Sequence, residues 1–232
     1  MTLISLLLFL LELMFSNQLT RKVIKGIDYI DQTEKYPTGC ESISTVMCLN
    51  YHGFNIEPTE FIDKYLEKGK FFLKNNKKYG PDPTKKFAGS PYDSSSYGCY
   101  EPVIAAAINK LIKERNLEDK FEVKKLTNVP VETLIVDYID NNFPVIFWAT
   151  IDFKESYINY ERNTWIIPET GKEFTWRSNE HCLLLIGYDN KTSKYIFLDP
   201  WNNHGMIEVD MDLVKQRHSE QYSMAVAIIR KD

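Results

Sequence analysis

The segment from Gln32 to Tyr51 reads QTEKYPTGCESISTVMCLNY. A Pro-Thr-Gly turn precedes Cys40, and the apolar residues after Cys40 recur at helical spacing as far as Tyr51, just before a glycine that suits a helix end. We therefore predict a helix over residues 40–51 that begins at Cys40. The N-terminus of a helix carries partial positive charge and free N–H groups, which favour a thiolate over a thiol. Cys40 is thus the candidate nucleophile.

A nucleophilic cysteine needs a base, and His181 is the best placed of the four histidines. Only His181 begins a strongly apolar strand, which reads HCLLLIGY over residues 181–188. A histidine at a strand edge is more often structural, but with a cysteine nucleophile and a third partner it indicates catalysis. Cys48 and Cys182 lie in apolar surroundings and fit the small buried hydrophobe that a free cysteine usually is.

Asp199 is the candidate that orients His181. The turn sequence DNKTS at residues 189–193 predicts that the strands on either side of it pair as a hairpin. In that hairpin His181 lies opposite residues near 202, two to three positions from Asp199. Asp189 lies about 26 Å away along the extended strand and cannot reach the imidazole. The amides of Asn202 and Asn203 are the alternatives to Asp199.

A developing oxyanion needs hydrogen-bond donors, and Gln32 offers one from eight residues before Cys40. The backbone N–H of Cys40 at the helix start would be the second donor. Glu180 should point to the opposite face of its strand from His181, because strand side chains alternate. No Cys/His spacing fits a zinc ligand pair, so we expect neither a metal nor a cofactor.

These residues resemble a known family. Gln32–Tyr51 closely resembles the nucleophile segment of the peptidase C39-like family, which belongs to the papain-like superfamily. Further motifs follow in the family's order: Ser90-Pro91 with Tyr97-Gly98, Pro144-Val145-Ile146, EHCLLLIGYD at 180–189, and Asp199-Pro200. His181 follows Cys40 by 141 residues, within the range of roughly 130–150 for papain-like enzymes. The resemblance spans roughly residues 27–230. It implies a papain-like fold with the family's Gln, Cys, His and Asp at Gln32, Cys40, His181 and Asp199, and it implies no substrate.

The order of predicted elements indicates an α+β fold, with N-terminal helices packed on a C-terminal antiparallel sheet. Besides the helix at 40–51, periodicity predicts helices at 59–67, 101–114 and 130–139. Strand-like runs lie at 121–126, 143–151, 182–188, 194–198, 205–209 and 222–229. We predict one peptidase domain over residues 26–232, preceded by an apolar N-terminal segment at 1–25.

Residues 70–100 are rich in Gly, Pro and Ser, which predicts a long irregular loop. The loop also carries aromatic residues that a merely solvated linker would lack. We expect its part from Tyr79 to Tyr100 either to line a substrate groove beside Cys40, with Tyr97 or Tyr100 near the site, or to cover a helix edge. Trp201 has the placement of the tryptophan that covers the histidine contact in papain-like sites, with core packing as the equal alternative.

The charge of the chain and its apolar N-terminal residues indicate which binding partners and which cellular location to expect. The chain has 232 residues and a net charge of −4, with basic residues scattered rather than clustered, so we expect no nucleic-acid partner. Residues 3–15 are almost wholly apolar but shorter than the roughly 20 residues of a spanning helix. They also lack a basic start and a small-residue cleavage site. Secretion or membrane association through residues 3–15 and a cytoplasmic location thus stand as equal alternatives, and the oligomeric state is left undetermined.

The function that these predictions favour is a cysteine peptidase, a thiol hydrolase that acts on a peptide or protein substrate through a Cys-His-Asp triad. Two alternatives use the same fold. One is a non-catalytic module that holds a peptide in the groove, and the intact set of Cys40, His181, Asp199 and Gln32 argues against it. The other is an acyltransferase that passes the acyl group to an amine instead of water.

Overall fold

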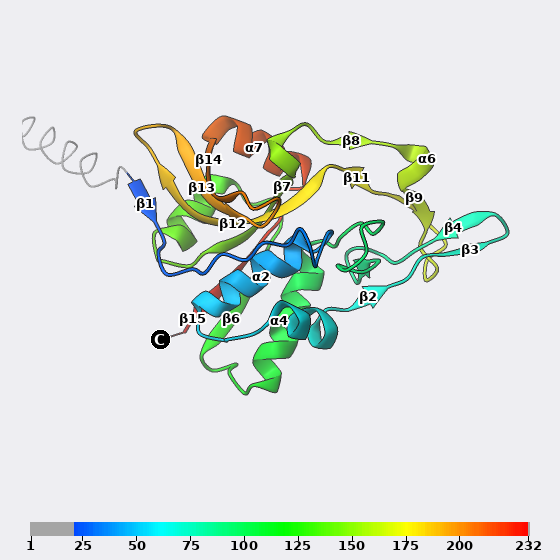
Figure 1. Cartoon of the computed structure of the whole chain (residues 1–232), viewed down its shortest axis with the longest axis horizontal. Coiled ribbons are helices and arrows are strands. Elements are labelled where there is room, and N and C mark those ends of the chain that lie inside the picture. The colour runs from blue at the N-terminus through cyan, green and yellow to red at the C-terminus, as the bar shows by residue number, and fades with distance from the viewer. Residues whose placement is uncertain (1–20, 232) are drawn as a thin grey trace, which may run out of the picture.

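The structure is a computed structural model that describes residues 21–231. The apolar segment at residues 3–15 lies outside the described residues, as does most of the predicted N-terminal segment at 1–25. No helix within residues 21–231 combines the length and the apolar character needed to cross a membrane. The described chain forms a mixed α+β fold in which helices flank a central antiparallel sheet (Figure 1).

The central sheet has seven strands in the order β14-β13-β12-β7-β15-β6, and β1 pairs with the far end of β12. Every pairing in it is antiparallel. All ten residues of β12 are buried, as expected for a strand that is covered on both faces. The strands are β1 (Arg21–Val23), β6 (Phe121–Leu126), β7 (Val145–Thr150), β12 (Glu180–Asp189), β13 (Lys194–Asp199), β14 (Gly205–Asp210) and β15 (Ala225–Arg230).

Helices cover both faces of this sheet, with α2 and α4 on one side and α7 on the other (Figure 1). The helix α2 packs against β12 and β7, and its first ten residues are all buried. The helical elements are α2 (Cys40–Tyr51), α3 (Pro58–Glu60), η1 (Phe61–Tyr65), α4 (Glu101–Glu114), α5 (Val131–Leu134), η2 (Ile135–Ile139), η3 (Ile151–Phe153), α6 (Tyr160–Asn163) and α7 (Met211–Glu220). The predicted arrangement of helices on an antiparallel sheet is thus confirmed.

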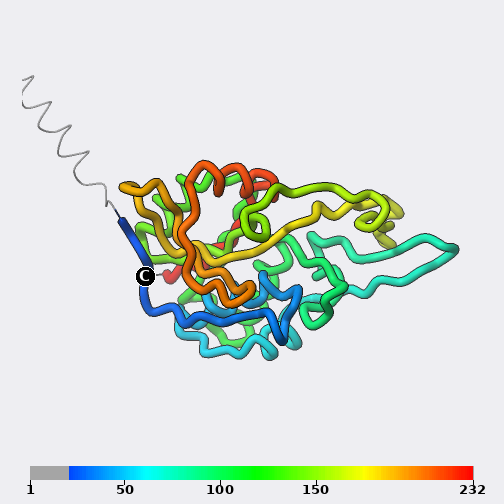
Figure 2. The backbone as a smooth tube through the Cα atoms, turned by 45° about the horizontal axis from the view of Figure 1, so that its top comes forward, coloured from blue at the N-terminus to red at the C-terminus, as the bar shows by residue number. Residues whose placement is uncertain are grey.

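An extension projects from this body and consists of short strands from two distant parts of the chain (Figure 2). Its strands are β2 (Lys68–Gly69), β3 (Phe72–Lys74), β4 (Lys77–Tyr79), β5 (Phe87–Ala88), β8 (Tyr157–Ile158), β9 (Thr164–Ile166), β10 (Glu173–Thr175) and β11 (Arg177–Ser178). The prediction of an irregular loop over 70–100 was wrong for residues 72–79 and 87–88. Residues 72–79 form a short hairpin of β3 and β4, and β5 pairs with β2. Strands of two or three residues are too short to show the alternating pattern by which a strand is predicted.

Candidate active site

A cleft of about 340 Å³ brings the main predicted site residues together. Cys40 reaches it from the start of α2, and His181 from the start of β12. Gln32 and Trp201 line it from loops. The other lining residues are Pro37, Thr38, Ser96, Tyr97, Ile151, Tyr157, Asn163, Trp176, Ser178, Asn179 and Glu180. Segments far apart in the sequence therefore meet at one concave surface.

Cys40 is the first residue of α2, as predicted. The residue before it is Gly39, where a Cβ atom would lie 2.8 Å from the Cβ of Tyr36 and 3.3 Å from that of Pro91. Only glycine therefore allows the turn to approach this closely. The turn packs against the loop at residues 90–96, since Thr38 Oγ1 donates to the carbonyls of Ser90 and Asp93, both at 3.1 Å. This packing fixes where the helix begins.

The imidazole of His181 points at Asp199. His181 Nε2 lies 2.7 Å from Asp199 Oδ1, and both side chains are buried. Because the carboxylate accepts this hydrogen bond, Nε2 carries the proton and Nδ1 is the nitrogen left for another partner. A β-bulge between Leu185 and Gly187 shifts the hairpin register by one residue relative to an unbroken hairpin. Asp199 contacts His181 despite this shift.

The Asp199 carboxylate accepts hydrogen bonds from three donors. Besides His181, the ring Nδ1 of His204 donates to its Oδ2 at 2.9 Å, and the N–H of Trp201 donates to Oδ1 at 3.0 Å. Burial alone would raise the pKa of Asp199, but these hydrogen bonds outweigh it and hold the pKa below its usual value. Asp199 is therefore a carboxylate across the neutral range. The alternatives Asn202 and Asn203 donate their backbone N–H groups to Thr33 and Asp31 instead.

Gln32 is buried at the edge of the cleft. Its backbone N–H donates to the carbonyl of Pro200 at 2.9 Å, which joins its segment to the turn after Asp199. Its side-chain Nε2 donates to the carbonyl of Pro37 at 3.5 Å, a long hydrogen bond. A donor held this weakly is free to turn toward a ligand in the cleft.

The hydrogen bond of the Cys40 thiol differs from the sequence-based expectation. Cys40 Sγ donates to Glu41 Oε2 at 3.3 Å, and within residues 21–231 no hydrogen bond joins it to His181. Burial, followed by the charges of Glu41 and Glu180, raises the pKa of the thiol well above its usual value. The sequence predicted a lowered pKa, which is wrong for this conformation because the thiol is buried and two carboxyl groups lie beside the sulfur.

Glu41 and Glu180 were not predicted as site residues. The ligand atoms of Cys40, Glu41 and Glu180 all lie within 4.8 Å of one another, and this set is the one group in the described chain with the spacing to hold a metal ion. Sequence reasoning placed Glu180 on the opposite face from His181 and pursued it no further. A glutamate in the first turn of a helix is usually a solvated partner of the helix dipole, so Glu41 carries no clear signal.

The aromatic candidates take different positions. Tyr97 and Trp201 line the cleft. Tyr100 does not, and instead stacks on Trp176 with ring centroids 5.2 Å apart, behind the cleft wall. The hydroxyl of Tyr97 accepts from Lys78 Nζ at 2.7 Å and donates to the carbonyl of Arg162 at 2.9 Å. These bonds join the loop at 87–100 to both parts of the extension.

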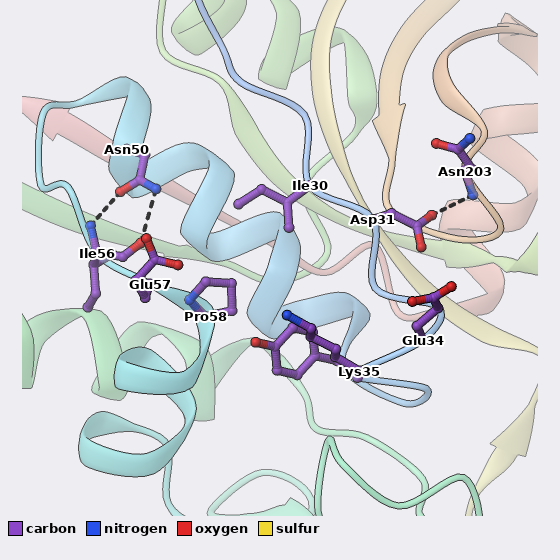
Figure 3. Close-up of a pocket in the computed structure, with 10 residues that line it drawn as sticks. Ile30, Asp31, Glu34, Lys35, Asn50, Ile56, Glu57, Pro58 and Asn203 are labelled. Atoms are coloured by element: carbon purple, nitrogen blue, oxygen red, sulfur yellow. Dashed lines mark hydrogen bonds between the residues drawn. The ribbon is translucent and has the colours of Figure 1, made fainter.

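A larger hollow of about 640 Å³ is lined by residues of the segment at 30–36, by residues at 56–58, and by Asn50 and Asn203 (Figure 3). Asp31, Glu34 and Lys35 line it from that segment, and Glu57 lines it from the turn before α3. Asp31 is held in place there, since its Oδ2 accepts from the N–H of Asn203 at 2.5 Å. None of the candidate triad residues lines this hollow, so the smaller cleft is the candidate active site.

Comparison with known proteins identifies the family and the fold. The sequence profile of the Peptidase C39-like family matches residues 24–226. The fold is similar to the crystal structure of a candidate C39-like peptidase from Bacillus anthracis, with a TM-score of 0.73 and 22% identity over 91% of this chain and 98% of that one. No curated protein matches the sequence.

Two further solved structures are more distant. The peptidase domain of Streptococcus ComA, a bi-functional ABC transporter involved in quorum sensing, has a TM-score of 0.45 and 15% identity over 90% of this chain and 96% of that one. Xylellain, a cysteine protease from Xylella fastidiosa, has a TM-score of 0.48 and 12% identity over 94% of this chain and 88% of that one.

Proposed function

The chain belongs to the Peptidase C39-like family, and from this membership we propose that it is a cysteine peptidase that hydrolyses peptide bonds. In this proposal Cys40 is the nucleophile, His181 the base and Asp199 the residue that orients the base. Gln32 and the N–H of Cys40 donate to the oxyanion. The observation that carries the proposal is that Cys40, His181 and Gln32 line one cleft, with the Asp199 carboxylate 2.7 Å behind His181.

The proposed reaction begins with a proton transfer. Because His181 Nε2 is hydrogen-bonded to Asp199, Nδ1 is the nitrogen that takes the thiol proton. The transfer occurs once the thiol has turned from Glu41 toward the imidazole. The thiolate attacks the peptide carbonyl, and the negative charge that develops on the oxygen is stabilised by the donors at Gln32 and Cys40. The imidazolium then gives its proton to the leaving amine. Water, activated by the neutral imidazole, hydrolyses the thioester and restores the thiol.

Peptide mass spectrometry tests this proposal without knowledge of the substrate. The protein is incubated with a peptide library prepared from a digested proteome, and new N-termini are counted. We expect cleavage by the unaltered protein and loss of at least about 10³-fold in Cys40→Ala, because no nucleophile then remains. Cys48→Ala is the matched control. Cys48 lies on the same helix, with its Sγ 3.6 Å from the carbonyl of Pro144, so this variant should retain cleavage.

The same experiment distinguishes the alternatives. Glycinamide is added as an acceptor amine, and products that carry it at a new C-terminus would indicate acyl transfer. A peptide-binding module would instead retain library peptides equally well with and without the Cys40 sulfur and would release no new termini. Either result would overturn hydrolysis as the principal activity.

A further inference from the structure

Two buried carboxyl groups flank the candidate nucleophile and have no part in the mechanism above. Glu41 follows Cys40 in the first turn of α2 and is fully buried, and Glu180 begins β12 and is 8% exposed. Gly98 provides the space for both. A Cβ atom at residue 98 would lie 2.5 Å from Glu41 Oε1 and 3.2 Å from Glu180 Oε2. The two carboxyl groups therefore meet over the bare backbone of a glycine.

The hydrogen bonds of Glu41 connect this pair to the thiol. Glu41 Oε2 accepts from Cys40 Sγ at 3.3 Å, and Glu41 Oε1 accepts from the backbone N–H of Cys99 at 2.6 Å. Glu180 Oε1 is buried and has no hydrogen-bond partner among the described residues. The Glu41 carboxyl is thus held against the Cys40 sulfur. The Glu180 carboxyl lies beside it, with one buried oxygen that makes no hydrogen bond within the described residues.

The titratable groups around the pair include three thiols and, in the same cleft, the imidazole of His181. The thiols of Cys40 on α2, Cys99 before α4 and Cys182 on β12 all interact with Glu41. No lysine or arginine is among the described residues that line the cleft. Burial raises the pKa of Glu41 to about 7 and, together with the charge of Glu41, raises the pKa of Glu180 well above its usual value. The pair therefore retains at least one proton at neutral pH.

We propose that Glu41 is a positioning residue whose charge, shared with Glu180, controls whether the Cys40 thiol can ionise. This inference rests on the proposed function in that it takes Cys40 as the nucleophile. When Glu41 is protonated, its O–H can donate to a thiolate and stabilise it. When Glu41 is ionised, it accepts the thiol proton in a hydrogen bond and opposes a second negative charge. The proton that leaves sulfur goes to His181, so the carboxyl pair keeps its own proton in the active form.

The proposal predicts a particular pH dependence. Below pH 7 Glu41 is neutral, and replacing it with glutamine changes no charge. Above pH 7 the protein with Glu41 carries a carboxylate beside the sulfur, and Glu41→Gln does not. The glutamine can still accept from the N–H of Cys99, and its amide N–H can donate to a thiolate. The variant should therefore differ from the unaltered protein only on the alkaline side.

The test is the rate of iodoacetamide alkylation at Cys40, followed by peptide mass spectrometry from pH 5.5 to 8.5. EDTA is present, so that no bound cation offsets the carboxylates. We expect Glu41→Gln and the unaltered protein to react alike at pH 5.5, and the variant to react about tenfold faster at pH 8, which corresponds to about one unit in the thiol pKa. Glu180→Gln should leave the rate at pH 8 close to that of the unaltered protein, because the one charge of the pair then stays on Glu41 beside the sulfur.

Glu101→Gln is the matched control, since Glu101 is also a buried glutamate in a first helical turn but accepts from Thr127 Oγ1. Its rate ratio to the unaltered protein should stay near one at every pH. A Glu41→Gln ratio that does not change with pH would show that Glu41 only holds the loop, and would overturn the proposal. If Glu41→Gln does not fold, Glu41→Asp decides, because the shorter side chain draws the carboxylate away from the sulfur. It should react faster than the unaltered protein at pH 8 and like it at pH 5.5, and a ratio that does not change with pH would overturn the proposal. The readout needs no substrate, so failure of the peptidase assay does not affect it.

Discussion

The Asp199 carboxylate is hydrogen-bonded to two imidazoles, with Oδ1 accepting from His181 and Oδ2 from His204. The ring of His204 is partly exposed, whereas His181 is buried. The hydrogen bond from His204 therefore ties the buried carboxylate to the surface and limits its rotation. A carboxylate fixed in this way can hold the His181 ring in one orientation and stabilise its charged form.

Asp199→Asn should keep the fold and lower kcat/KM by about 10²-fold, because an amide still contacts the ring but stabilises an imidazolium less. The measurement is cleavage of a peptide selected from the library, with circular dichroism to verify folding. Asp189→Asn is the control at the opposite end of β12, where Asp189 accepts from Arg21 Nη1 at 2.7 Å. An equal loss of activity in both variants would remove the assigned role of Asp199.

The sequence predicted three residues of the candidate site because each belongs to a recognisable local pattern, and a fourth, Gln32, from its distance to Cys40 and from the family resemblance. Cys40 begins a helix, His181 begins an apolar strand, and a hairpin turn brings Asp199 back toward His181. The sequence could not predict the direction in which the pKa of Cys40 shifts. That direction depends on Glu41 and on Glu180, and the second of these comes within reach of the sulfur only when β12 packs against α2.

The loop at residues 87–100 is held at the cleft by Tyr97. Its ring packs against Phe71, Trp165 and Trp176, with centroid distances of 5.0–5.9 Å, while its hydroxyl bonds to Lys78 and Arg162. The ring contributes apolar contact, and the hydroxyl contributes two polar links between segments.

Tyr97→Phe removes the links and keeps the ring. We expect KM to rise several-fold with kcat almost unchanged, and the free energy of unfolding to fall by about 1–2 kcal/mol for two lost hydrogen bonds. Steady-state kinetics and urea unfolding provide the measurements. Tyr92→Phe is the control in the same loop, since the Tyr92 hydroxyl donates to Asp63 at 3.1 Å and does not line the cleft. Equal effects in the two variants would argue against a binding role for Tyr97.

The bounds of helices and strands were predicted correctly where the pattern is local, and strands were missed where it depends on distant residues. The helix at 101–114 and the strand at 121–126 have the predicted bounds, because each carries a complete periodic pattern. The strands at 157–178 contain two or three residues each and were not predicted. Short strands such as these are specified by the aromatic cluster they pack on, which includes Trp165 and Phe174 at 4.9 Å.

The helix α7 is attached to the sheet by His218. Its Nδ1 donates to the carbonyl of Trp148 in β7 at 2.8 Å, and its ring stacks on Phe147 at 4.0 Å. Burial lowers the pKa of His218 to about 4. Because the unfolded chain binds a proton near pH 6.5 and the folded chain does not, the stabilisation by neutral His218 is complete above pH 6.5 and declines as the pH falls toward 4.

His218→Asn keeps a donor for the Trp148 carbonyl and removes this titration. The unaltered protein should be the more stable at pH 7, because it has the ring contact. This advantage should shrink by up to about 3 kcal/mol between pH 7 and pH 4. Urea unfolding across that range measures the difference. Ser219→Ala, on the same helix, should leave the pH dependence unchanged. A constant difference between His218→Asn and the unaltered protein would contradict a neutral buried imidazole.

At the scale of the molecule, the candidate site lies where two layers meet. Cys40, the proposed nucleophile, belongs to the helical layer, whereas His181 and Asp199, the proposed base and its partner, belong to the sheet (Figure 1). Their relative position is set by the packing of α2 on β12 and β7. The Ser44 hydroxyl contributes to this packing by donating to the carbonyl of Cys182 at 3.1 Å.

The position of β15 in the sheet limits how far the nascent chain can fold. This strand lies between β7 and β6, so the sheet under α2 is incomplete until residues 225–230 are available to join it. During translation these residues leave the ribosome long after Cys40 and His181 have emerged. A half-made molecule thus carries Cys40 on a helix whose supporting sheet still lacks β15.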